Sequence, residues 1–217
     1  MQSQLSRQSQ LSRASQSQGG FPSELRPLPQ DATGAELVSE RLILRAPTAL
    51  DIHAIAHLAN NIDVASKVSR MPHPYTVKDA ENFVARAISG AMGKCVFAIT
   101  RKTDGDFIGA CALGSHEDPR GLEAGYWLGQ AFWNRGLGTE ALQTVIDFGF
   151  VHFDADYIDA RVRVMNTGGR RVLQKSGFQF QGTGMAPSIA LGGMTAVEWF
   201  RLDRKTWGSL RHWGGQR

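Results

Sequence analysis

The most informative part of the sequence is the run Trp133-Asn134-Arg135-Gly136-Leu137-Gly138-Thr139-Glu140-Ala141. It joins a strand-like segment over 122–128 to a predicted helix over 139–153, whose apolar residues recur with helical spacing. Glycine lets the backbone approach a ligand closely, and a helix start offers unpaired N–H groups and the positive end of the helix dipole. Such a junction binds a phosphate or pyrophosphate group, to which Arg135 can add a charge-assisted contact.

Three kinds of phosphate-binding loop compete for this junction. A Walker loop requires Gly-Lys-Ser/Thr, and no lysine is present here. A dinucleotide-binding fingerprint requires a parallel strand–helix–strand unit with an acid about 20 residues further on. Asp159 lies at roughly that distance, but the strands before the junction form a meander without a crossover helix. A coenzyme A loop remains, and on these residues alone an ordinary glycine turn before a helix explains the pattern equally well.

Outward from this junction, the periodicity of the apolar residues predicts the other elements. Helices are expected over 48–59, 76–88, 139–153 and 168–176, and strands over 40–45, 95–100, 107–113, 122–128, 157–164, 178–182 and 196–203. Thr48-x-x-Asp51 and Thr76-x-x-Asp79 are capping signatures, and Asp104-Gly105 marks a hairpin. The predicted strand over 157–164 alternates cleanly between apolar and polar residues. Its polar side is formed by Tyr157, Asp159, Arg161 and Arg163. The order of elements indicates an α+β fold rather than a doubly wound one.

Charge and composition exclude several classes of protein. The net charge of +4 is concentrated at the ends, because 1–34 carries +1 and 201–217 carries +4, while 35–200 carries −1. A near-neutral core argues against a dedicated DNA-binding domain. Two cysteines, Cys95 and Cys111, make neither a disulfide framework nor a four-ligand zinc site, and we expect buried thiols in a reducing compartment. No run of 18 apolar residues is present, so we expect no membrane association.

The first part of the chain has a different character from the rest. QSQLSR occurs at 2–7 and again at 8–13, within a segment that has too few apolar residues to offset the entropy of ordering. We therefore predict a disordered tail over 1–34, a folded domain over 35–210 and a C-terminal tail over 211–217. An organellar transit peptide is the alternative for the first segment. We favour a simple low-complexity extension and a cytoplasmic protein.

Taken together, the elements and motifs resemble the GNAT N-acetyltransferases, and within them the Rim-type enzymes that acetylate ribosomal-protein N-termini. The resemblance runs from about Glu40 to Leu210. It rests on Glu40-Arg41-Leu42-x-Leu44-Arg45 with Asp51, Pro72-x-Pro74-Tyr75-Thr76 with Asp79-Ala80, Gly125-Tyr126-Trp127-Leu128, the Trp133–Ala141 run, Asn166, Val172-Leu173-x-Lys175-x-Gly177-Phe178 and Leu202-x-Arg204-x-x-Trp207.

The resemblance implies a mixed, mostly antiparallel, seven-stranded sheet that is flanked by helices. Its fourth and fifth strands, Glu123–Leu128 and Tyr157–Val164, would splay apart to form a cleft for acetyl-CoA as cosubstrate. The backbone of Trp127 and Leu128 would pair with the pantetheine arm like an added strand. The pyrophosphate would bind at Arg135, Gly136, Leu137, Gly138 and Thr139. Asn166 would bond the pantetheine arm, although a turn residue before a helix explains it as well.

The implied reaction is direct attack of an amine on the thioester carbonyl. A protonated amine cannot attack, so a base is required, and the resemblance assigns that catalytic role to Glu123. His116 is the next candidate because its ordinary pKa suits the task. A backbone N–H near Leu128 would hold the oxyanion. His53 and His57 have the spacing of a metal pair but lack a third ligand, so no metal is expected.

Three positions depart from the family pattern. Trp133 stands where many relatives carry Gln or Arg, although the Rim-type subgroup commonly has Trp. Gly169 stands where the ribosomal-protein enzymes place a serine, and Leu173 stands where other branches carry a tyrosine, so no general acid is evident. These departures keep two alternatives open: a non-catalytic CoA-binding module, and a ribosome- or nucleic-acid-associated protein that uses its basic ends. The acceptor is a protein N-terminus or a small-molecule amine. It would bind between 60–75 and 182–195, two expected loops whose low charge disfavours a polyamine. A monomer or a homodimer is expected.

Overall fold

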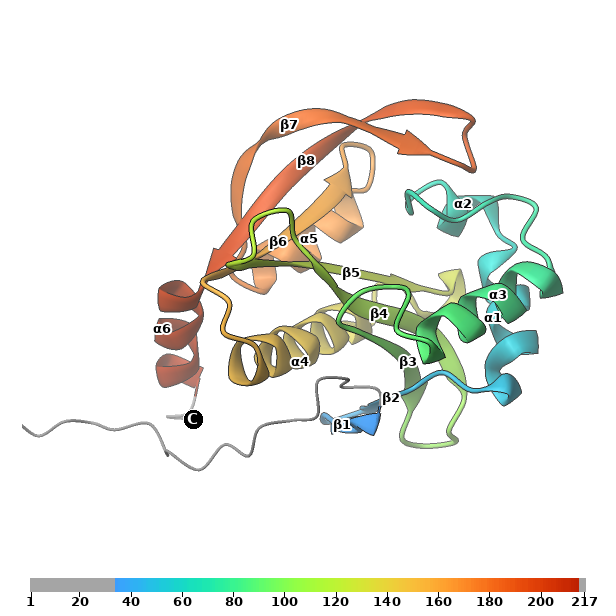
Figure 1. The fold of residues 1–217 in the computed structure, drawn as a ribbon, viewed down its shortest axis with the longest axis horizontal. Helices are drawn as coiled ribbons and strands as arrows, with labels where there is room; N and C mark the ends of the chain where they lie inside the picture. The colour runs from blue at the N-terminus through green and yellow to red at the C-terminus, as the bar shows by residue number, and fades with distance from the viewer. Residues whose placement is uncertain (1–33, 215–217) are drawn as a thin grey trace, which may run out of the picture.

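The computed structural model describes residues 34–214, in which an open eight-stranded sheet is flanked by helices (Figure 1). The predicted N-terminal tail, apart from Gly34, lies outside the described residues, as do 215–217. The sheet has the order β1-β2-β3-β4-β5-β6-β8-β7. Its strands are β1 (Leu37–Val38), β2 (Leu42–Arg45), β3 (Cys95–Arg101), β4 (Phe107–Ser115), β5 (Gly121–Leu128), β6 (Tyr157–Arg163), β7 (Gln179–Ser188) and β8 (Gly193–Asp203).

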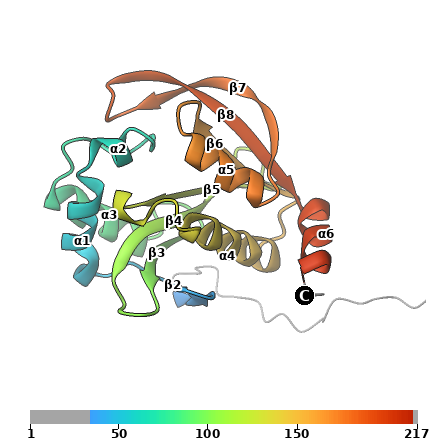
Figure 2. The ribbon, with the colours of Figure 1, turned by 180° about the vertical axis from the view of Figure 1, so that it is seen from behind.

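The helices cover both faces of the sheet (Figure 2). They are α1 (Ile52–Ala59), α2 (Ile62–Ala65), α3 (Val77–Ile88), α4 (Leu137–His152), α5 (Thr167–Lys175) and α6 (Arg204–Gly214), with short 3-10 turns η2 (Ala49–Asp51) and η3 (Gln130–Phe132). Successive residues of a strand point to opposite faces, and β3 shows the result. Phe97 and Ile99 join the core beneath α4, whereas Ala98 joins the core beneath α1 and α3. Two apolar cores therefore lie on either side of one sheet.

The predicted capping residues hold the start of the domain. Thr76 and Asp79 form a reciprocal capping box at the start of α3. Arg45 donates two hydrogen bonds of 2.8 Å to the carboxylate of Asp51, which also accepts from the backbone N–H of Thr48 at 2.7 Å. Burial by itself would raise the pKa of Asp51, but the hydrogen bonds from Arg45 and Thr48 outweigh burial and lower it. This partly buried ion pair ties the end of β2 to the turn that leads into α1.

The structure differs from the sequence expectation in three places. The sheet has eight strands rather than seven, because Leu37–Val38 pairs with the end of β2. The segment expected as a loop over 182–195 is a long hairpin, in which β7 is an edge strand and therefore tolerates Pro187. Helices α2 and α6 were not expected, and α6 extends past residue 210, at which the domain was expected to end.

Both cysteines are buried, as expected. Cys95 and Cys111 are both free and buried, and burial raises the pKa of Cys95 to about 12 and that of Cys111 further. Thiols with such values stay protonated and unreactive at neutral pH. Between residues 34 and 214, no helix combines the length and the apolar character required to cross a membrane.

Candidate active site

Strands β5 and β6 separate partway along their length, as the resemblance implied. They are parallel and are paired from Gly121 with Tyr157 to Ala124 with Ala160. Beyond that pair, β5 continues to Leu128 and β6 to Arg163 without pairing with each other. A Cβ atom built on Gly125 would meet nothing within 4 Å, so the backbone there is open. This divergence leaves one side of 125–128 available for strand-like pairing with an extended ligand.

The start of α4 lies next to the splay and presents unpaired amides. Gly136 is the residue before the helix and has φ +77°, a left-handed conformation that glycine adopts without strain. No side chain among residues 34–214 caps the helix at this end, so the N–H groups of the first turn are not satisfied by a cap. Arg135 is exposed beside them. Unpaired amides and an exposed arginine are groups that fit a phosphate or pyrophosphate, so the prediction of such a site at this junction stands as a prediction.

Side chains of β5 and of the loop hold each other in place. Trp133 donates from its indole Nε1 to the carbonyl of Leu128 at 2.8 Å, which ties the loop to the end of β5. A Cβ atom built on Gly138 would lie 3.0 Å from the ring of Tyr126, so glycine at this position lets α4 pack closely on β5. Burial raises the pKa of Tyr126 far above its ordinary value, which keeps its hydroxyl neutral.

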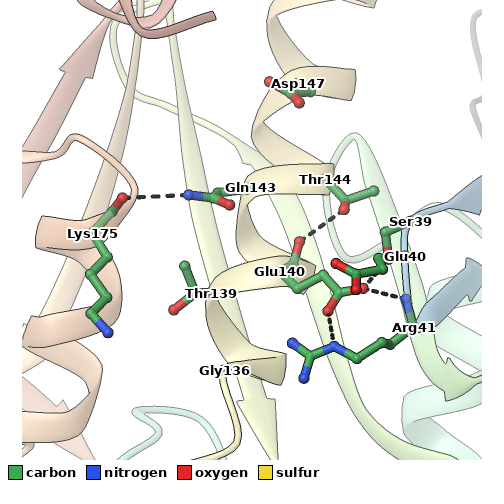
Figure 3. A pocket seen from close by; sticks show the side chains of 10 residues that line it. All are labelled: Ser39, Glu40, Arg41, Gly136, Thr139, Glu140, Gln143, Thr144, Asp147 and Lys175. Carbon is green, nitrogen blue, oxygen red and sulfur yellow. Dashed lines mark hydrogen bonds and ion pairs between the residues drawn. The ribbon is translucent and has the colours of Figure 1, made fainter. Parts of the chain in front are cut away.

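A carboxylate in the first turn of α4 joins this loop to the beginning of the domain (Figure 3). Glu140 accepts hydrogen bonds from the hydroxyl of Ser39 at 2.8 Å and from the backbone N–H of Arg41 at 2.6 Å. Arg41 also donates from Nε to Glu140 at 2.7 Å and from Nη1 to the carbonyl of Arg135 at 3.0 Å. Burial opposes ionisation of Glu140, yet these hydrogen bonds prevail and lower its pKa. Glu140 therefore supports the loop rather than the chemistry.

An open cavity of about 480 Å³ lies along the same turns of α4 (Figure 3), and none of the residues that line it belongs to β5 or β6. It is bordered by 39–41, by one side of α4 from Gly136 to Asp147, and by Lys175. Neither Glu123 nor Trp127 reaches it. Two of the residues predicted to bind a pyrophosphate, Gly136 and Thr139, border it, whereas the predicted base, Glu123, lies elsewhere, on the sheet.

Glu123 lies on the opposite face of the sheet from α4, next to the last residues that join β5 to β6. It is opposite Asp159 in the parallel register, and its Oε1 lies 3.6 Å from Nε of Arg161. Both side chains are partly open to solvent, at 39% for Glu123 and 48% for Arg161. A carboxylate that is accessible at the mouth of the splay can accept a proton from an incoming amine, directly or through water.

His116 has both ring nitrogens engaged. Its Nδ1 accepts a hydrogen bond from the backbone N–H of Asp118 at 3.0 Å, and its Nε2 lies 3.3 Å from a carboxylate oxygen of Asp159. This tautomer carries its proton on Nε2 and leaves no lone pair for a substrate amine. Asp159 is held further by two hydrogen bonds from Arg201, at 2.7 and 2.8 Å. The ring of His116 thus belongs to a structural network, which favours Glu123 as the base.

Asn166 begins α5 at the end of the opposite strand. Its Oδ1 accepts from the N–H of Gly169 at 2.9 Å, so the capping alternative describes part of its role. A Cβ atom on Gly169 would lie 2.6 Å from Nδ2 of Asn166 and 2.9 Å from Val162, which leaves no room for a serine without rearrangement. Leu173 is 4% exposed and packs in the core beneath α4 and α5. Neither position can supply an acid to the splay.

The basic C-terminal segment is largely used within the fold. Arg201 pairs with Asp159, and Arg211 forms an ion pair with Asp147. Arg204 donates to three backbone carbonyls, each at 2.8 Å, at the end of α4 and the turn that follows it. Three of the basic side chains of 201–217 are therefore committed inside the domain, which counts against a nucleic-acid surface there.

Most of the predicted site residues come together in space. Trp127, Leu128 and the loop over 135–139 meet at the end of β5, Asn166 lies across the splay, and Glu123 lies on the face away from α4. Sequence reasoning missed the roles of Arg41 and Arg161, although the alternation over 157–164 had already placed Arg161 and Arg163 on one side. In residues 34–214, no cluster of three or more His, Cys, Asp or Glu side chains is arranged to hold a metal ion.

Comparison with known proteins shows which family the chain resembles. The model of the acetyltransferase (GNAT) domain family matches residues 41–179, more than half of the chain. An uncharacterised N-acetyltransferase of Bacillus licheniformis, p20, is 27% identical over 174 residues, which cover 78% of this chain and 96% of p20.

Solved structures have the same fold. A GCN5-related N-acetyltransferase from Brucella melitensis superposes with a TM-score of 0.70 at 20% identity, covering 87% of each chain. RimJ from Mycobacterium smegmatis, in complex with CoA-disulfide, superposes with a TM-score of 0.67 at 20% identity, covering 83% of this chain and 93% of RimJ.

Proposed function

The chain belongs to the GNAT acetyltransferase family, and we propose that it transfers an acetyl group from acetyl-CoA to an amine, either a protein N-terminus or a small-molecule amine. The observation that carries this proposal is the combination of an open splay between β5 and β6 with an uncapped start of α4 at its end. The first fits an extended pantetheine arm, and the second fits a pyrophosphate.

The donor side of the site uses mainly backbone groups. The amides of Gly136 to Thr139 and the side chain of Arg135 would bind the pyrophosphate, and the open edge of Trp127 and Leu128 would pair with the pantetheine arm. Asn166 already uses Oδ1 to begin α5, so Nδ2 is the group that would donate to that arm. A backbone N–H near Leu128 would stabilise the carbonyl oxygen.

On the acceptor side, Glu123 is assigned the role of base. Acetyl-CoA supplies a thioester whose carbonyl carbon is attacked by the amine nitrogen as the C–S bond breaks and CoA leaves. Glu123 takes the proton that the amine loses, and its exposure at the mouth of the splay allows that proton to pass to solvent. The CoA thiolate, with an ordinary thiol pKa of about 8.5, can take its proton from water, because Gly169 and Leu173 offer none.

Two measurements test the proposal. Acetyl-CoA at 100 times its dissociation constant should stabilise the protein by about 2.7 kcal/mol in thermal unfolding. Acetyl-pantetheine should bind far more weakly, because it lacks the pyrophosphate that would interact with the amides at the start of α4. A thiol reagent should then detect CoA release with a panel of peptides and amines. Binding without release for any acceptor would instead identify a CoA-binding module, and the absence of binding would reject the proposal.

A further inference from the structure

The face of the sheet that carries Glu123 continues onto β6, β8 and β7. Strand alternation places Asp159, Arg161 and Arg163 of β6 on this face, since Ile158, Ala160 and Val162 enter the core beneath α4 and α5. Arg163 is paired with Val197 in the register with β8, and Arg161 with Trp199. Arg163 therefore lies at the end of β6 beyond the splay, on the side where an acceptor would approach Glu123.

Arg163 is buried and incompletely bonded. Its exposed fraction is 5%, its Nη2 donates to the carbonyl of Pro187 at 3.1 Å, and its Nε and Nη1 have no hydrogen-bond partner among residues 34–214. Burial lowers the pKa of Arg163, but an arginine remains charged at any pH at which the protein is folded. A buried cation without a counter-charge is strongly unfavourable.

Each of the neighbouring arginines has an acidic side chain close to its guanidinium group. Arg161 faces Glu123, Arg170 pairs with Glu198 at 2.6 Å, and Arg201 pairs with Asp159. In the part of the chain that the structure describes, Arg163 has no such acid. These three arginines are balanced by acids, whereas the buried guanidinium of Arg163 has three N–H groups, on Nε and Nη1, for which the described residues offer no acceptor.

The surroundings of Arg163 belong to the acceptor side. Ser188, next to the Pro187 that Arg163 contacts, is 3% exposed and its hydroxyl also has no partner among the described residues. One residue further on, the N–H of Ile189 donates to the carbonyl of Ser69 at 3.1 Å. The two segments expected to shape the acceptor pocket, 60–75 and 182–195, therefore meet at the residue that follows Ser188, and Figure 1 shows the hairpin of β7 and β8 reaching toward α2.

We propose that Arg163, with Ser188 beside it, binds a carboxylate on the acceptor, so that the enzyme selects amines that also carry a negative charge. Nitrogens that only donate require an oxygen acceptor, and a carboxylate brings both the oxygens and the missing charge. The proposal rests on the acetyltransferase function and specifies its substrate class. It also predicts poor binding of cationic acceptors such as polyamines, which would meet Arg161 and Arg163.

Binding of acetylated products tests the proposal without requiring turnover. Calorimetry would be carried out with CoA saturating the proposed phosphate site. It would compare the dissociation constants of N-acetylated tripeptide amides that carry Glu at position one, two or three with those of their Gln counterparts. The same comparison would be made between N-acetyl-β-alanine and its amide. At least one of the carboxylic acids should bind at least about 30-fold more tightly than its uncharged amide counterpart, because its carboxylate completes a buried charge pair with Arg163. Arg163→Met should reduce that ratio to within about threefold, and Arg163→Lys should retain part of it. Arg86→Met, at an exposed site on α3, should leave it unchanged.

The outcomes separate the two proposals. A ratio near one for every pair in the wild-type protein, or a ratio that survives Arg163→Met, would overturn the carboxylate site while leaving acetyl transfer intact. Failure of CoA itself to bind would count against the acetyltransferase proposal, and the acid–amide comparison could still be made without it. If Arg163→Met does not fold, the wild-type ratio and its partial retention in Arg163→Lys decide the matter. A preference for the peptides or for the β-alanine pair would identify a protein terminus or a small amine as the acceptor.

Discussion

Arg41 and Glu140 lie 99 residues apart in the chain and are joined twice, from the backbone N–H of Arg41 to Oε1 at 2.6 Å and from its Nε to Oε2 at 2.7 Å. Because Arg41 also reaches the carbonyl of Arg135, one side chain connects the start of β2, the first turn of α4 and the loop before it. The conformation of the proposed pyrophosphate site therefore depends on contacts outside its own loop.

Glu140→Gln should weaken acetyl-CoA binding about three- to tenfold, because the charge-assisted bonds that hold the loop become neutral ones. The free energy of unfolding should fall by about 1.5–3 kcal/mol. Calorimetry and urea unfolding would measure the two effects. Glu81→Gln, which removes a more exposed ion pair with Lys78 on α3, is the matched control and should change neither. A loss of stability without any loss of affinity would limit the Arg41–Glu140 contact to a role in the fold.

Gly136 and Gly105 form a matched pair for testing the loop, since their φ angles are +77° and +76°. Alanine at either position is strained by about 1–2 kcal/mol. Gly136→Ala should lose that stability and also bind acetyl-CoA more weakly, because a Cβ atom there would lie 3.3 Å from Nη2 of Arg41 and would displace the side chain that holds the loop. Gly105→Ala lies at a hairpin turn with open space around it and should lose only stability. Equal affinities in the two variants would show that Gly136 has no part in binding.

Glu123→Gln should lower kcat by about 100-fold or more, while the dissociation constant of acetyl-CoA stays the same, because the change removes the base but not the donor site. Steady-state kinetics together with calorimetry would separate the two parameters. Glu117→Gln, at a nearby exposed position, should behave as the wild type does. An unchanged kcat in Glu123→Gln would move the proton transfer to another group.

Gly169→Ser should destabilise the protein by about 1–3 kcal/mol rather than improve turnover, because its Cβ atom would overlap Asn166 and Val162. Asn166 would have to leave the start of α5, where its Oδ1 holds the N–H of Gly169. Thermal unfolding and kcat would be measured together. Gly168→Ser is the control, since the closest atom to its Cβ lies 3.8 Å away. Higher turnover in Gly169→Ser at full stability would contradict the steric argument.

Acid should destabilise the domain partly through Asp51, whose folded pKa lies below its ordinary value near 3.8. A depressed pKa contributes stability that is complete above the ordinary value and is lost as the pH falls through the folded one. Asp51→Asn should cost about 1.5–3 kcal/mol at pH 7 and progressively less below pH 4. Urea unfolding at a series of pH values would show the gap narrowing. A gap that stays constant with pH would exclude the Arg45 contact as its cause, and Asp154→Asn, at an exposed position, should show no gap.

The sequence was informative where local patterns and chemistry coincide. The capping box of Thr76 and Asp79, the Asp104-Gly105 turn and the glycines at the start of α4 specify structure over a few residues, and the structure confirms each. The long hairpin could not be read from the segment over 182–195, because glycines and Pro187 interrupt its alternation and the strands are stabilised mainly by each other. The Arg41–Glu140 contact, and the lack of an acidic partner for Arg163 among the described residues, depend on residues that are distant in the sequence. No local sequence pattern contains that information.

The β5–β6 junction has a mechanical consequence. It holds the sheet together through four register pairs, whereas β4 with β5 and β6 with β8 each have seven. The sheet thus consists of two parts, β1 to β5 on one side and β6, β8 and β7 on the other, which are joined by this short pairing. A ligand that contacts both β5 and β6 beyond Ala124 and Ala160 would therefore add a further connection between the two parts of the sheet.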